Sequence, residues 1–132
     1  MLALARDGLD PAGLEEVEAV AATDQLVAAR RGVGAISAPD EVAAYVVAVV
    51  RTTRELPSVE LGASPRAAVH LLGAARAAAA LAGRDFVTPD DVAGVAPSVL
   101  RHRLVLRPEA ELDRYTADDA VGTALGSVPV PR

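Results

Sequence analysis

Apolar side chains recur at helical spacing through most of this chain, and the clearest row lies in its first half. Four residues there fall at positions i, i+3, i+4 and i+7, on one face of a helix: Val42, Tyr45, Val46 and Val49. We expect Ser37 to cap this helix, and Val47 and Val50 to widen its apolar face. The pattern predicts a central helix.

Three other segments carry local signals for the start or end of a helix. Thr23 precedes an acidic residue and opens a helix that we expect to end where Gly32 and Gly34 follow two arginines. Thr88 and Thr116 each precede an acidic pair in the same way, the latter opening a helix over 117–125. These signals predict three further helices.

An alanine-rich helix is expected from Pro65 to about Ala82, because Gly83 is a typical C-terminal stop. Its apolar side is predicted to consist of Val69, Leu72, Ala75 and Ala79. Pro97 is expected to kink or end the helix that begins after Thr88, and residues 104–106 to form a short strand or extended arm. We therefore predict an all-α fold, a small bundle of four or five helices with at most a minimal strand element.

The length and amino-acid composition of the chain are those of a single helical domain. Of 132 residues, 52% are hydrophobic but only 2% aromatic, so alanine, valine and leucine must build the core. The absence of cysteine excludes disulfides and thiolate metal sites, and no apolar run approaches the length of a membrane span. The net charge of −5 argues against nucleic-acid binding. All 13 basic residues are arginines, which excludes a P-loop because that motif needs a lysine.

The segment from Gly62 to Ala67 contains the main candidate site. We expect Ser64 to cap the helix and Pro65 to occupy its first position, which places Arg66 in the first turn. A cation there costs about 0.3–1 kcal/mol against the helix dipole, and an anion in front of the helix would remove that conflict. The alternative is that Arg66 pairs with a nearby carboxylate or reaches solvent.

Other charged groups have simpler explanations. The pairs Asp90–Asp91 and Asp118–Asp119 follow threonine caps, where acidic residues favour the helix dipole. Neither His70 nor His102 has a second ligand at metal-binding spacing, so no metal site is expected. The run 101–103, Arg-His-Arg, is either a surface for an anion or acidic partner or a solvated face.

Four segments of the chain, taken in sequence order, resemble the C-terminal lid domain of MoxR-type AAA+ ATPases. The resemblance covers roughly residues 23–111 and rests on four segments: Leu61–Ala67, Gly83–Val92, Val99–Leu104 and Glu109–Glu111. It implies that Arg66 is the sensor 2 residue, which contacts the γ-phosphate of ATP, and that Gly62, Ser64 and Pro65 belong to the same nucleotide-binding segment. It also implies a role in ATP hydrolysis and chaperone-like remodelling or metal insertion.

The resemblance further implies a division of the chain and a set of partners. Residues 1–22 would be a linker or remnant of a missing ATPase core, 23–115 the lid, and 116–132 a C-terminal helix and tail. The core would hold ATP and Mg²⁺, because this chain has no Walker A or Walker B motif and is not expected to be catalytic alone. Its partners would be that core, neighbouring subunits of a cytoplasmic ring and an unidentified client protein. The alternative is a free-standing helical interaction module that binds no nucleotide.

Overall fold

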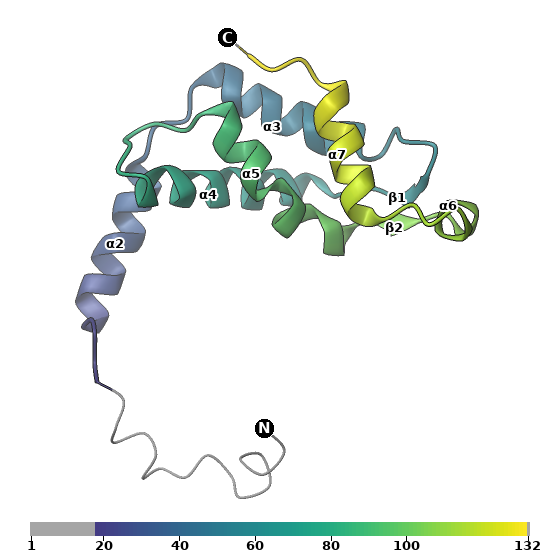
Figure 1. Ribbon diagram of the computed structural model, residues 1–132. Helices are drawn as coiled ribbons and strands as arrows, with labels where there is room; N and C mark the ends of the chain where they lie inside the picture. Colours follow the sequence, from purple (N-terminus) through teal and green to yellow (C-terminus); the bar gives the residue numbers. More distant parts are fainter. Residues whose placement is uncertain (1–17, 132) are drawn as a thin grey trace, which may run out of the picture. The chain divides into compact units, whose positions relative to one another are not determined.

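The computed structural model describes residues 18–131, and this part of the chain is predominantly helical (Figure 1). It contains six α-helices: α2 (Thr23–Ala35), α3 (Asp40–Thr52), α4 (Pro65–Leu81), α5 (Pro89–Leu100), α6 (Pro108–Leu112) and α7 (Ala117–Ser127). The all-α fold is confirmed, with one helix beyond the expected number because the short segment α6 forms a helix of its own. The expected linker over residues 1–22 lies outside the described residues as far as residue 17.

The described part of the chain divides into two units, one ending at Arg30 and the other beginning at Arg31. Helix α2 continues through Gly32 and Gly34 to Ala35, so the expectation that these glycines end it was wrong. A glycine inside a helix costs about 1 kcal/mol relative to alanine, but it ends a helix only where the backbone turns into the left-handed conformation. Neither glycine has a positive φ.

Helix α3 supplies the predicted apolar face to the core. Val42, Tyr45, Val46 and Val49 are all buried, as is Val50. Burial raises the pKa of the Tyr45 hydroxyl, and the nearby Asp90 charge adds to this effect. Val47, however, is 58% exposed, which corrects the expectation that it widens this face.

Ser37 does not cap α3, because Pro39 occupies the N-cap position. The backbone of Ser37 instead bonds to the extended piece before α5: its N–H donates to the Asp85 carbonyl at 2.8 Å, and its carbonyl accepts from the Val87 N–H at 2.9 Å. The two segments form a parallel bridge between Ser37 and Phe86. A non-local contact has taken the place of the expected cap.

The buried face of helix α4 overlaps the predicted one but is centred on other residues. Its buried residues follow a strict four-residue step: Ala67, Leu71, Ala75 and Ala79. Leu72 is partly buried and packs against the core, as predicted, whereas Val69 is 72% exposed, so one of the four predicted positions was wrong. Small side chains in an i, i+4 row allow a neighbouring helix to approach closely, and α4 packs against both α3 and α5.

Three local signals for the start or end of a helix are confirmed, those of Gly83, Thr88 and Thr116. Gly83 follows α4 with a φ of +72°, the left-handed conformation that ends many helices. Thr88 and Thr116 each cap their helix with a reciprocal pair of bonds to the third helical residue. Pro97 lies inside α5, which continues to Leu100 and is followed by the 3₁₀ turn η2 (Arg101–Arg103).

The minimal strand element is a pair of short antiparallel strands, β1 (Val59–Leu61) and β2 (Val105–Leu106). Val59 pairs with Leu106 and Leu61 with Val105. This pairing fixes the chain immediately before the candidate segment that starts at Gly62. Among the described helices, none combines the length and apolar character needed to cross a membrane.

Candidate functional site

Arg66 lies in the first turn of α4, and its side chain is exposed to solvent. Within residues 18–131, no carboxylate lies at ion-pair distance from its guanidinium group. The first turn of α4 also contains no acidic residue. In the described part of the chain, the guanidinium and the positive end of the helix dipole therefore face solvent without a compensating anion.

The start of α4 is built differently from the expected cap. Ser64 occupies the N-cap position with an extended backbone, but its side chain makes no capping hydrogen bond. Only its backbone carbonyl is engaged, accepting from the Ala67 N–H at 2.8 Å. Pro65 follows at the first helical position as predicted. The Ser64 hydroxyl therefore forms no hydrogen bond to the first turn of the helix that contains Arg66.

Gly62 is required by its contact with the residues that follow α3. A Cβ atom at this position would lie 2.5 Å from the Arg54 Cγ and 2.7 Å from the Arg54 Cα and N atoms. Two of these three are backbone atoms, which cannot move away as the end of a side chain can. The backbone at Gly62 therefore packs directly against that of Arg54.

Two residues at this contact were not recognised as part of the site from the sequence. The Thr53 hydroxyl accepts a hydrogen bond from the Ala63 N–H at 3.0 Å, and Arg54 Nη1 donates to the Ala63 carbonyl at 2.8 Å. Thr53 is fully buried although it is polar. A usable signal was present, because Thr53 continues the buried row of α3 four residues after Val49.

The carboxylate pairs have structural roles, as predicted. Arg84 donates two hydrogen bonds to the Asp91 carboxylate, one of them 2.7 Å long between Nη1 and Oδ2. Thr88 adds further bonds to the same carboxylate. The Arg84 bond holds the pKa of Asp91 well below its usual range, and the same bond raises the pKa of Arg84.

The second pair behaves in the same way at α7. Asp119 bonds to the cap residue Thr116, and these bonds lower the pKa of Asp119. Asp118 forms an exposed ion pair with Arg101 at 3.3 Å. Among residues 18–131, no cluster of three or more His, Cys, Asp or Glu side chains has the arrangement of a metal site.

The Arg-His-Arg run forms η2, and two of its members bond within the chain. Arg101 pairs with Asp118, while Arg103 Nε donates to the Val99 carbonyl at 2.9 Å. His102 and His70 are both exposed. The run therefore does not present three cations to a single anion.

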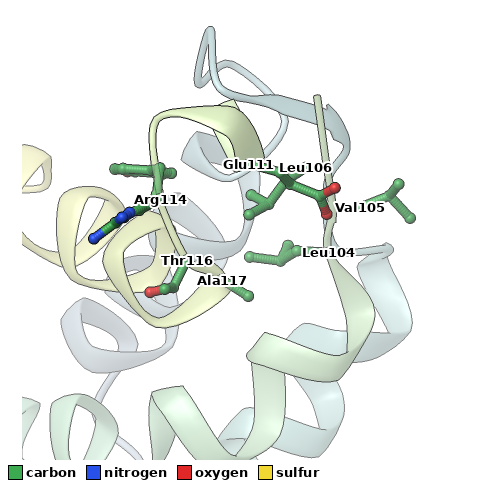
Figure 2. A pocket seen from close by; sticks show the side chains of 8 residues that line it. Leu104, Val105, Leu106, Glu111, Arg114, Thr116 and Ala117 are labelled. Carbon is green, nitrogen blue, oxygen red and sulfur yellow. The ribbon is translucent and has the colours of Figure 1, made fainter. Parts of the chain in front are cut away.

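A separate groove of about 610 Å³ lies between β2, α6 and the start of α7 (Figure 2). Its lining combines apolar and charged side chains, including Leu104, Leu106, Glu111 and Arg114. Arg114 has a φ of +62°, which belongs to the turn that leads from α6 to α7. None of the predicted site residues lines this groove, so the candidate site is an exposed helix start rather than a cavity.

Comparison with known proteins gives matches that agree with one another. The profile of the AAA lid domain family matches residues 51–123. YeaC of Bacillus subtilis is 40% identical over 118 residues, which cover 89% of this chain and 37% of YeaC. The chaperone MoxR1 of Mycobacterium tuberculosis is 41% identical over 97 residues, or 67% of this chain and 26% of MoxR1.

A solved structure shares the fold. The crystal structure of a candidate ATPase from Cytophaga hutchinsonii superimposes with a TM-score of 0.77 at 27% identity, over 83% of this chain and 36% of that one. The chain thus spans about a third of the length of the relatives it matches.

Proposed function

Because the chain belongs to the AAA lid domain family and is a lid of the MoxR type, we propose that it acts as the nucleotide-sensing lid of an AAA+ ATPase. Arg66 is the sensor 2 residue in this proposal, and its guanidinium contacts the γ-phosphate of ATP. The observation that carries the proposal is the state of Arg66: exposed, at the N-terminus of α4, and without an ion-pair partner among residues 18–131.

The arrangement suits an anionic ligand for three additive reasons. The N–H of Arg66 is a first-turn amide that has no intrahelical acceptor, the helix dipole is positive at this end, and the guanidinium offers up to two parallel bonds to phosphate oxygens. Gly62, Ser64 and Pro65 hold this turn in place and form the rest of the nucleotide-facing segment.

The chemical role of Arg66 follows from how phosphoryl transfer is catalysed. Negative charge on the transferring group is stabilised by positioned cations, and a fixed guanidinium does this without reorganisation of solvent. Loss of that group on hydrolysis removes the charge that holds Arg66, so the lid is free to change its position. Arg66 therefore couples hydrolysis to movement of the whole helical unit.

The remaining nucleotide ligands belong to the partner domain. An ATPase core supplies the Walker motifs and holds Mg²⁺, and the lid works with this core and with neighbouring subunits of a ring in the cytoplasm. Chaperone-like remodelling of a client protein or metal insertion is the expected output. Residues 23–115 form the lid in this proposal, with 1–22 as the link to the core and 116–132 as the C-terminal helix and tail.

A hybrid ATPase tests the proposal. This chain replaces the matching segment of YeaC, and steady-state ATP turnover is compared for the unchanged hybrid and for Arg66→Ala. We expect kcat to fall about 10²-fold, which corresponds to the loss of one preorganised donor to a charged transition state.

Arg76→Ala is the control, because it removes an arginine from the same helix nearly three turns away from the proposed contact. It should leave kcat within about twofold. Two outcomes would contradict the proposal: a hybrid that assembles but does not hydrolyse ATP although unchanged YeaC does, or an Arg66→Ala hybrid that turns over ATP at the unchanged rate.

A further inference from the structure

The backbone of Ala63 is held at both of its polar groups by the two residues that follow α3. Its N–H donates to the Thr53 hydroxyl at 3.0 Å, and its carbonyl accepts from Arg54 Nη1 at 2.8 Å. The Thr53 hydroxyl in turn donates to the Val50 carbonyl at 2.7 Å, so its proton is directed away from Ala63 and its lone pair toward it. Both Thr53 and Ala63 are 0% exposed.

The adjoining residue is fixed by packing. Gly62 lies so close to Arg54 that a Cβ atom would come within 2.7 Å of the Arg54 backbone. One residue earlier, Leu61 is paired with Val105 in the two-stranded sheet. From Leu61 to Ala63 the chain is therefore held by strand pairing, by close backbone packing and by two hydrogen bonds.

The attachment of Ala63 to Thr53 and Arg54 controls the start of α4, because the usual side-chain N-cap hydrogen bond is absent there. Thr88 and Thr116 close the first turns of α5 and α7 with their own side chains, whereas the Ser64 side chain forms no such bond. Arg66 lies only three residues after Ala63 along the chain. The position and direction of the first turn of α4 thus depend on the contact with Thr53 and Arg54.

We propose that Thr53 and Arg54 are positioning residues that fix Arg66 in its orientation toward the terminal phosphate of ATP, an inference that rests on the proposed function. Neither residue touches the nucleotide. Their effect passes through the backbone from Ala63 to Arg66, and it sets how accurately the guanidinium meets the transferring group. Misplacement by about 1 Å can reduce the rate of a positioned reaction by up to about 10²-fold.

The test uses the YeaC hybrid that carries this chain. Thr53→Val keeps the shape of the side chain and removes the hydroxyl, whereas Thr53→Ser keeps the hydroxyl. We expect Thr53→Val to lower kcat about tenfold and to raise the KM for ATP by a smaller factor, because the Arg66 contact is stronger in the transition state than in the ground state. Thr53→Ser should restore kcat to within about twofold of the unchanged hybrid.

Arg54→Met provides a second variant on the protein surface. It keeps an unbranched apolar stem against Gly62 and removes the bond to the Ala63 carbonyl. The same reduction in kcat is expected, in a variant that does not disturb the buried core. Val121→Ala is the control for lost stability, because Val121 is 0% exposed and lies on α7, away in sequence from Thr53, Arg54 and Ala63. It should lower the unfolding midpoint without lowering the kcat of the folded hybrid.

A double variant separates positioning from a general structural effect. If Thr53 acts through Arg66, then Thr53→Val combined with Arg66→Ala should be no slower than Arg66→Ala alone. Additive losses, or an unchanged kcat in both Thr53→Val and Arg54→Met, would overturn the inference while the proposed function stands. An unchanged kcat in Arg66→Ala would instead overturn the proposed function, and this inference with it.

Discussion

Replacing Gly62 with alanine should destabilise the helical unit, although replacing a glycine with alanine usually stabilises a protein where the backbone allows it. The added Cβ would lie 2.7 Å from two backbone atoms of Arg54 and 2.5 Å from its Cγ. Overpacking of this kind costs about 1–3 kcal/mol. Alanine also restricts the unfolded chain and recovers about 0.4–1 kcal/mol. The net loss in the free energy of unfolding should be about 1.3 kcal/mol, the difference between the centres of these two ranges.

Gly73→Ala is a matched control in which the same chemical change should have the opposite sign. Gly73 lies in the middle of α4, and a Cβ there meets no atom within 4 Å. Removing an interior helix glycine should stabilise the protein by up to about 1 kcal/mol. The difference between the two variants isolates the contact at Arg54 from the general preference for alanine.

Thermal and urea unfolding followed by far-ultraviolet circular dichroism measures both effects. For a domain of roughly 100 residues, about 1 kcal/mol corresponds to a change in Tm of roughly 4–8 °C. We therefore expect a lowered Tm for Gly62→Ala and a raised Tm for Gly73→Ala. If Gly62→Ala unfolds at or above the wild-type midpoint, the close packing of the segment on Arg54 is refuted.

Two more predictions concern the bundle itself. Leu71 is 0% exposed, and Leu71→Ala should lower the free energy of unfolding by about 2–5 kcal/mol. Leu81 in the same helix is 91% exposed, and Leu81→Ala should change it by less than about 0.5 kcal/mol. Equal losses in urea unfolding would refute the observed buried face of α4. The ion pair with Arg84 lowers the folded-state pKa of Asp91. Its stabilising effect should be complete above the unfolded-state pKa of about 3.9 and lost as the pH falls further. The advantage of wild type over Asp91→Asn should be constant between pH 7 and about pH 5 and should shrink as the pH falls below about 4. An advantage that does not change at low pH would contradict the role of the ion pair.

Much of the fold could be predicted because its signals are local. Thr88, Thr116 and Gly83 act within one turn of their own position, and each was assigned correctly. The buried face of α4 could not be assigned in this way, since an alanine-rich helix has little contrast between its sides. Packing against its neighbours selected Ala67 and Leu71 for the core and left Val69 exposed.

The candidate site shows the same division between local and non-local signals. Arg66 could be found from the segment that precedes it, whereas its supporting contacts link residues nine and ten positions apart. Ser64 carries a capping signal as clear as that of Thr88, yet its side chain forms no cap. The attachment of Ala63 to Thr53 and Arg54 fixes this turn instead.

The central claim, that Arg66 contacts the terminal phosphate, is tested most directly by nucleotide discrimination. In the YeaC hybrid, the dissociation constants for ADP and for a non-hydrolysable ATP analogue are measured with and without Arg66→Ala. We expect the substitution to weaken binding of the triphosphate at least about tenfold, through the loss of a charge-assisted bond, while ADP binding changes little. Equal weakening of both nucleotides, or no change in either, would contradict the claim.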